Sequence, residues 1–122
     1  MRVVALDHIQ LAMPAGRESE ARAFYGNLLG LTEVPKPARL ATRGGLWFEQ
    51  PDLKVHLGID PGFRPARKAH PAFLVDDLPA LRARLAEAGY NSIDGDRGDN
   101  AYVDNPFGNR IELLAQPDDP RE

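Results

Sequence analysis

Residues 69–89, AHPAFLVDDLPALRARLAEAG, combine the pattern of a strand with that of the helix that follows it. Residues 70–75 alternate between the two faces of a strand, and His70 lies on the face opposite the bulky apolar side chains. Asp76 or Asp77 can then cap a helix. The apolar stripe of this helix ends before a glycine and consists of Leu78, Leu81, Leu85 and Ala88. The stretch therefore predicts a strand followed by an amphipathic helix.

The same order occurs earlier in the chain. Residues 3–13 have the pattern of a strand that ends before Pro14, and the helix predicted after it is closed by Gly30. The apolar stripe of that helix has the spacing i, i+3, i+4, i+7, i+8 and consists of Ala21, Phe24, Tyr25, Leu28 and Leu29. Turn residues then separate three short predicted strands, at residues 38–42, 46–49 and 54–59.

A second set of three strands follows the second helix. Residues 60–68, DPGFRPARK, have no hydrophobic period and predict a linker at about residues 61–68. The later strands are predicted at residues 90–93, 101–104 and 110–115. The order of one strand, one helix and three strands thus occurs twice. Because such a unit cannot bury both faces of its sheet alone, we expect two copies to pair into one curved sheet with the helices outside.

Length and composition limit the possible functions. A chain of 122 residues fits a single domain, with one module at about residues 1–60 and the other at about 69–116. The net charge of −3 and the scattered cations argue against nucleic acid as a partner. No apolar run is long enough to cross a membrane, and no signal sequence is recognisable, so we expect a cytoplasmic protein with no membrane partner. Without cysteine, any metal site must use His, Asp or Glu.

Four predicted strands each carry one side chain that could bind a metal, on the face opposite their apolar residues. These side chains are His8, His56, His70 and Glu112. Imidazole and carboxylate ligands suit a divalent ion such as Zn, Ni, Fe, Co or Mn, and four ligands on a six-coordinate ion leave two positions for substrate. If His56 does not bind, the other three form a two-histidine, one-carboxylate set.

Five stretches together resemble the motifs of the vicinal oxygen chelate superfamily, which includes glyoxalases, bleomycin resistance proteins and dioxygenases. In chain order they are DHIQLAMP (7–14), ARAFYGNLLGL (21–31), KVHLGI (54–59), AHPAFLVDDLPALRARLAEAG (69–89) and VDNPFGNRIELL (103–114). The resemblance implies an α+β, glyoxalase-like fold of two paired βαβββ modules, whose curved sheet is mostly antiparallel. It also implies a homodimer and a metal held at the four positions named above.

One position departs from the glyoxalase I members that the chain resembles. Those members carry Glu where this chain has His56, and their paired carboxylates act as ligand and as proton-transferring base. Here Glu112 is the only carboxylate of the four, so a glyoxalase-type isomerisation would depend on Glu112 as the catalytic residue.

The expected function is therefore a metal-dependent lyase or isomerase, similar to lactoylglutathione lyase. It would act on a small substrate with two adjacent oxygens, through an enolate or enediolate. Three alternatives stay open: an extradiol-type dioxygenase, a fosfomycin-type thiol transferase with a thiol cosubstrate, and a bleomycin-resistance-like protein that only binds a drug.

Weaker candidates come from the aromatic and basic side chains. The aromatic ones could line the substrate cavity or fill the core, and they are Trp47, Phe48, Tyr102 and Phe107. The basic ones could hold an anionic group or remain solvated, and they are Arg39, Arg43, Arg64, Arg67 and Lys68.

Overall fold

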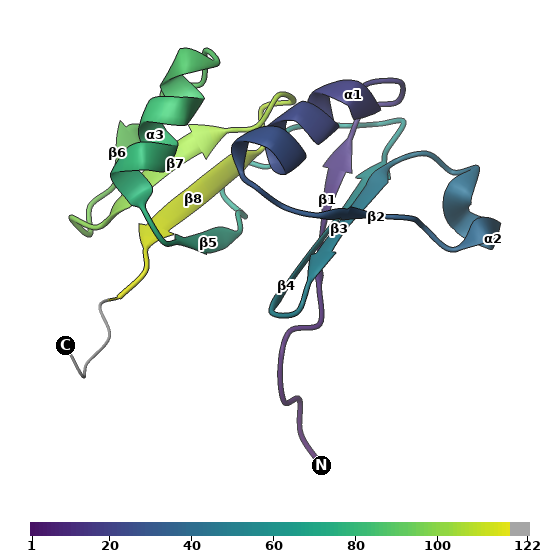
Figure 1. Cartoon of the computed structure of the whole chain (residues 1–122). Coiled ribbons are helices and arrows are strands. Elements are labelled where there is room, and N and C mark those ends of the chain that lie inside the picture. The colour runs from purple at the N-terminus through teal and green to yellow at the C-terminus, as the bar shows by residue number, and fades with distance from the viewer. Residues whose placement is uncertain (118–122) are drawn as a thin grey trace. The chain divides into compact units, whose positions relative to one another are not determined.

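Two modules make up the described chain, and each contains one strand, a helical segment and three further strands in that order; the first has the additional short helix α2 (Figure 1). The computed structural model describes residues 1–117, and it divides into a compact unit Met1–Arg64 and a second unit that begins at Pro65. The first unit contains β1 (Ile9–Met13), α1 (Glu18–Ala21), the π-helical segment η1 (Arg22–Leu28), β2 (Glu33–Val34), α2 (Ala38–Ala41), β3 (Leu46–Gln50) and β4 (Leu53–Ile59). The second contains β5 (Ala72–Val75), α3 (Leu78–Glu87), β6 (Ile93–Asp94), β7 (Asn100–Asp104) and β8 (Arg110–Ala115).

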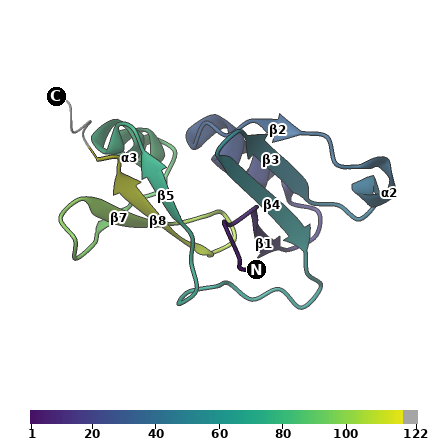
Figure 2. The same ribbon diagram turned by 90° about the horizontal axis from the view of Figure 1, so that it is seen from below.

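Each module has its own four-stranded sheet, in the order β1-β4-β3-β2 or β5-β8-β7-β6. The first strand of each module runs parallel to the last, and the other neighbours are antiparallel. The parallel pair β1 and β4 is visible in Figure 2. This arrangement confirms the predicted α+β class and the repeated βαβββ order.

The core of the first module lies between its sheet and the helix formed by α1 and η1. Its buried side chains come from the helix and from every second position of the strands: Leu11, Met13, Ala21, Phe24, Tyr25, Leu46, Phe48, Val55 and Leu57. Because side chains alternate across a strand, the other face carries Gln10, Trp47 and His56, which occupy one row of the register.

The second module repeats this division of its strands. Leu78, Leu81 and Leu85 of α3 are buried together with Phe73, Ala101, Val103, Ile111 and Leu113 of the sheet. Asp77 is the N-cap of α3, since its carboxylate accepts a hydrogen bond from the backbone N–H of Ala80. The opposite face carries Ala72, Tyr102 and Glu112 in one row of the register.

The prediction of a strand at residues 38–42 is wrong, because residues 38–41 form the short helix α2. The first of the three strands that follow the helix is instead β2, whose Glu33 and Val34 pair with Phe48 and Trp47. Pro37, with φ −52° and no N–H to donate to a ladder, precedes the first residue of α2. A strand of only two residues is too short to show an alternation in the sequence.

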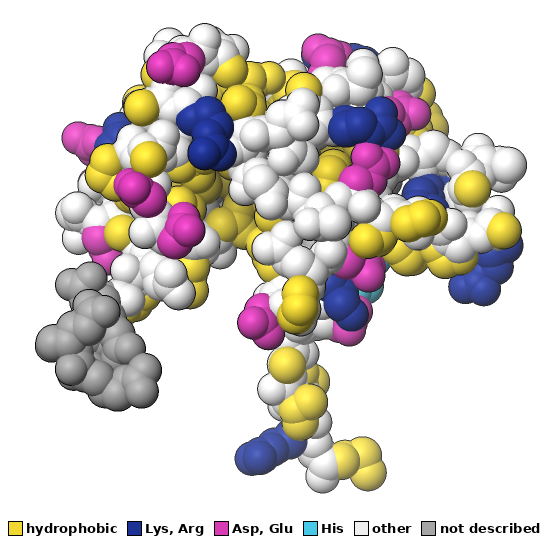
Figure 3. Space-filling model, viewed as in Figure 1, with side chains coloured by type: hydrophobic (Ala, Val, Ile, Leu, Met, Phe, Trp, Pro, Cys, Tyr) yellow, Lys and Arg dark blue, Asp and Glu magenta, His cyan; other side chains and the backbone are white. Residues whose placement is uncertain are grey.

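Two other predicted strands have different bounds. Pairing of the first strand begins at Ile9, and the residues before it are exposed, with apolar side chains along the N-terminal segment in Figure 3. The strand predicted at 90–93 is β6, which begins only at Ile93. Tyr90 instead donates its backbone N–H to Leu85 O and belongs to the end of α3. No described helix is long and apolar enough to cross a membrane.

Candidate functional site

His70 and Glu112 form a pair on the open face of the second sheet. Glu112 is opposite Ala72 in the register, and His70 precedes β5 by two residues, so both side chains lie on the same face. The Nε2 atom of His70 lies 2.9 Å from Oε1 of Glu112, and its Nδ1 atom lies 2.9 Å from the carbonyl oxygen of Lys68. Both ring nitrogens therefore face an acceptor.

A neutral imidazole has one N–H and can satisfy only one of these two acceptors. Both acceptors have a partner if both ring nitrogens of His70 carry a proton. They also have partners if Nδ1 carries the proton and a cation lies between Nε2 and the carboxylate. Metal-bound histidines commonly donate their other N–H to a backbone carbonyl, as Nδ1 can do here to Lys68. The surroundings of His70 thus match those of a metal ligand.

Glu112 is held from its other side by Asn100. The side-chain amide of Asn100 donates a hydrogen bond of 2.9 Å to Oε2, and both residues are buried. These bonds, from Asn100 first and His70 second, hold the pKa of Glu112 below its usual value against the opposing effect of burial. Glu112 is therefore ionised at neutral pH, as a metal ligand must be.

Tyr102 and Arg110 border this pair. The rings of Tyr102 and His70 pack edge to face, with 5.6 Å between their centres. The Arg110 guanidinium carbon lies 4.0 Å from the centre of the Tyr102 ring. Tyr102 is directly opposite Glu112 in the register. It therefore fixes one side of the His70 ring.

In the first module, His56 lies in a stack of rings. Its ring is parallel to that of Trp47 at 4.0 Å and stacks on that of His8 at 4.5 Å, which leaves His56 only 6% exposed. The Nε2 atom of His56 lies 2.7 Å from Oε2 of Glu49. His8 precedes β1, is exposed, and places Nδ1 2.9 Å from the carboxylate of Asp7.

The second-module pair fits a divalent ion better than the first-module pair does as it stands. Two neighbouring ligand atoms at about 2.1 Å from an octahedral ion lie about 3.0 Å apart, close to the spacing found between His70 and Glu112. The lone pairs of an imidazole lie in the ring plane, and the stacked rings of His8 and His56 lie in planes only 25° apart, so their lone pairs do not converge on one point between the rings. Within the described residues, no three His, Asp or Glu side chains form one metal-binding group.

The four aromatic candidates divide between the two faces of the sheets. Trp47 and Tyr102 lie on the open faces, in the rows of His56 and Glu112. Phe48 is 1% exposed and contacts the ring of Tyr25 at 5.8 Å, and Phe107 is also buried. The last two rings therefore pack inside their modules.

The sequence analysis missed Asn100 and Glu49, the partners of Glu112 and His56. Asn100 lies two residues before Tyr102 on β7, and Glu49 lies two residues after Trp47 on β3, so each shares a face with its partner. The alternation along each strand contains this signal, but it becomes readable only once the register is known. Of the basic candidates, Arg67 is paired with Asp104 and Arg43 lines a pocket.

Comparison with known proteins agrees with this architecture. A sequence model of the Glyoxalase-like domain family matches residues 10–114. A protein from Bacillus anthracis whose structure is assigned to the glyoxalase family is 43% identical, with a TM-score of 0.87 over 96% of this chain and 100% of that one.

Two more distant structures share the fold alone. A glyoxalase/dioxygenase from Nostoc punctiforme is 24% identical, with a TM-score of 0.73 over 97% of this chain and 99% of that one. The fosfomycin resistance protein FosX from Listeria monocytogenes is 16% identical, with a TM-score of 0.72 over 98% and 97%. The comparison with curated proteins finds no match. The family match and the repeated βαβββ order show that the chain belongs to the glyoxalase-like domain family of the vicinal oxygen chelate superfamily.

Proposed function

We propose that this protein is a divalent-metal-dependent enzyme of the glyoxalase type, which acts on a small substrate with two adjacent oxygen atoms through an enolate or enediolate. The observation that carries the proposal is the His70–Glu112 pair, in which an imidazole with both nitrogens facing acceptors meets an ionised, buried carboxylate. A bound divalent ion would supply Lewis-acid stabilisation of the negative charge that develops on a substrate oxygen.

His70 and Glu112 are the proposed ligands of the second module. The Lys68 carbonyl orients the His70 ring, and Asn100 fixes the Glu112 carboxylate through Oε2, so that Oε1 and Nε2 stay directed at each other. The family resemblance adds His8 and His56 as the proposed ligands of the first module. His56 would then bind through Nδ1, because Glu49 occupies its Nε2.

Glu112 is also the proposed catalytic residue, since it is the only carboxylate among the four positions. The hydrogen bonds that lower its pKa make it a weak base. Proton transfer to Glu112 therefore requires a substrate with an acidic C–H bond. A C–H bond on the carbon next to a polarised carbonyl group is acidic in this sense. A hydroxyketone or a thiol adduct of a ketoaldehyde has this property.

The metal content of the purified protein tests the proposal directly. Protein purified without added metal is analysed by mass spectrometry for Zn, Ni, Fe, Co and Mn, then depleted and titrated with Co²⁺, whose visible absorption reports its ligands. We expect one ion per chain, and a loss of at least tenfold in affinity for Glu112→Gln and for His70→Gln. Glu87→Gln, an equivalent change at an exposed position of α3, serves as the matched control.

Activity assays then separate the reaction classes. Turnover of a methylglyoxal–thiol adduct by the metal-loaded protein supports the glyoxalase type, oxygen uptake with a catechol supports a dioxygenase, and thiol addition to an epoxide supports a transferase. A protein that binds no metal in these titrations but still binds a drug would refute the proposal.

We also propose a homodimer, as the family resemblance implies. Light scattering coupled to size-exclusion chromatography measures the mass directly. The expected mass is twice the 13.4 kDa of one chain, and a single monomeric peak would contradict it.

A further inference from the structure

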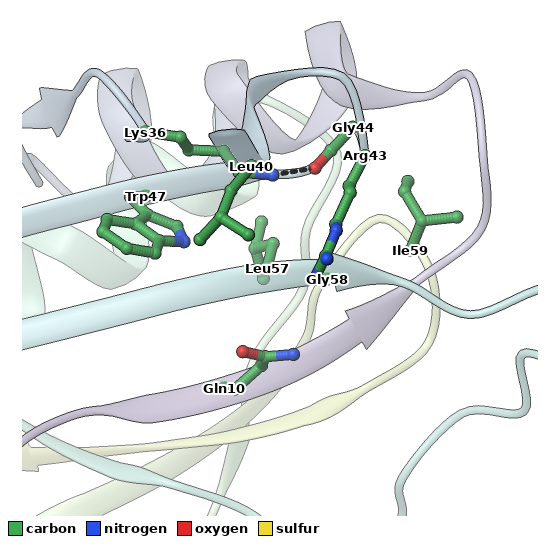
Figure 4. Close-up of a pocket in the computed structure, with 9 residues that line it drawn as sticks. All are labelled: Gln10, Lys36, Leu40, Arg43, Gly44, Trp47, Leu57, Gly58 and Ile59. Carbon is green, nitrogen blue, oxygen red and sulfur yellow. Dashed lines mark hydrogen bonds between the residues drawn. The ribbon is translucent and has the colours of Figure 1, made fainter. Parts of the chain in front are cut away.

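A pocket of about 270 Å³ lies on the open face of the first sheet, on the same side as His56. Its floor comes from β1, β3 and β4, and its rim comes from the segment that contains α2 (Figure 4). The lining residues are Gln10, Lys36, Leu40, Arg43, Gly44, Trp47, Leu57, Gly58 and Ile59.

The polar groups of this pocket are mainly N–H donors. In Figure 4 the Arg43 guanidinium, the Gln10 amide and the indole nitrogen of Trp47 all turn toward the hollow. Lys36 lies beside them and donates to the carbonyl oxygen of Gly44. No Asp or Glu lines the pocket, and within residues 1–117 no side-chain hydrogen bond or ion pair engages Arg43 or Gln10.

The place of the Gln10 amide depends on a glycine. A Cβ atom at Gly58 would lie 2.6 Å from Nε2 of Gln10, so any other residue at position 58 would push the end of the Gln10 side chain away from its present place. Because Gly58 has no side chain, the Gln10 side chain can lie across β4 with its amide in the pocket.

We infer that this pocket is an oxyanion-binding subsite, which takes the carboxylate or phosphate group of a small organic acid. Unpaired cationic and neutral N–H donors around a hollow without carboxylates are complementary to a negatively charged acceptor. The volume is close to the lower end for small-molecule pockets and suits one charged group with a short stem.

The subsite also adjoins the residues of the proposed active site. The Trp47 ring that lines the pocket also stacks on the ring of His56, with 4.0 Å between the ring centres, so the pocket and His56 share Trp47 as a neighbour. That the anion is the charged end of the substrate rests on the proposed function. The binding of an oxyanion by Arg43, Gln10 and Trp47 does not.

Trp47 provides the readout, because it is the single tryptophan of the chain. The whole metal-depleted, ¹⁵N-labelled protein is titrated with inorganic phosphate and, separately, with sodium acetate, at constant ionic strength set by sodium chloride. We expect a saturable shift of the one indole N–H resonance. The anion that saturates at lower concentration tells whether the subsite prefers phosphate or carboxylate.

Variants then assign the effect to the pocket. Arg43→Gln is expected to weaken binding about tenfold or more, since it removes the charge-assisted hydrogen bonds. Arg39→Gln makes the same change of charge on α2 but outside the pocket, and is expected to leave binding within about twofold. Gly58→Ala keeps every charge, displaces only the flexible end of Gln10, and is expected to weaken binding about threefold to tenfold.

Two results would overturn the inference: no saturable shift with either anion, or equal weakening by Arg39→Gln and Arg43→Gln. Circular dichroism and the dispersion of the remaining resonances show whether each variant is folded. If the anions bind but the protein holds no metal and turns over no substrate, the proposed function fails and the subsite stands. If metal and turnover are found but neither anion shifts the indole resonance, the subsite fails and the proposed function stands.

Discussion

Nε2 of His70, two residues before β5, lies 2.9 Å from Oε1 of Glu112 on the neighbouring parallel strand β8, although 42 positions separate the two residues in the chain. The contact joins an imidazole whose second nitrogen faces a carbonyl to a carboxylate whose second oxygen accepts from Asn100. The contact with Lys68 O therefore orients the His70 ring, and the hydrogen bond from Asn100 orients the Glu112 carboxylate. Such support from a second partner is typical of residues that must present their free atoms to a ligand.

Glu112→Gln should lower stability in a pH-dependent way. The folded-state pKa of Glu112 is below its ordinary value of 4.5, so the ionised form is stabilised by folding. That contribution is complete above the ordinary pKa and is lost as the pH falls through the folded-state pKa. Urea unfolding of metal-free protein should give a deficit of about 1–3 kcal/mol at pH 7, which shrinks below pH 4.5. A deficit that does not change with pH would contradict this origin.

Asn100→Asp should place a second carboxylate against Glu112. The donor that now lies 2.9 Å from Oε2 would become an acceptor, and two like charges would share a buried site. We expect a loss of about 2–3 kcal/mol at pH 7, which recovers as acid protonates one of the two carboxyls. Asn91→Asp, at an exposed position of the same module, should change stability by less than about 0.5 kcal/mol. Equal effects of the two variants in urea unfolding would refute the expectation.

Gly45→Ala should be far more damaging than Gly30→Ala. Both glycines have positive φ, 85° and 76°, but a Cβ at position 45 would lie 2.2 Å from the carbonyl oxygen of Leu57, whereas nothing lies within 4 Å of one at position 30. Backbone strain alone costs about 1 kcal/mol at Gly30. The collision of a Cβ at position 45 with the backbone of β4 should raise the cost at Gly45 to about 3 kcal/mol or more. Thermal unfolding of both variants gives the ranking, and similar melting temperatures would contradict it.

Asp77→Ala should destabilise α3, and Asp76→Ala should not. Only Asp77 accepts a hydrogen bond from the first turn of the helix, at the N–H of Ala80. Loss of an N-cap of this kind costs about 1 kcal/mol, whereas exposed Asp76 should change stability by less than about 0.5 kcal/mol. The two variants carry the same change of charge, so a comparison of their urea midpoints isolates the cap.

The sequence by itself determined the repeated order of one strand, one helix and three strands, but not the position of the first of those three strands in the first module. The i, i+3, i+4 stripe around Phe24 and the cap and apolar stripe of α3 are local signals, set by neighbours in the chain. Period-two alternation likewise predicted that His56 and Glu112 would lie opposite the helix-facing residues of their strands. The four candidate ligands could therefore be assigned to faces without knowing any contact between strands.

Only the tertiary structure decided which groups meet. It replaced the strand predicted at 38–42 with α2, because β2 pairs with β3 in its place. It placed Phe48 in the core and Trp47 beside the pocket. It also brought Asn100 into hydrogen-bonding contact with Glu112, and Glu49 into contact with His56. The physical reason is the range of the interactions: alternation, stripes and caps act over a few residues, whereas register and side-chain partners depend on strands that are distant in the chain.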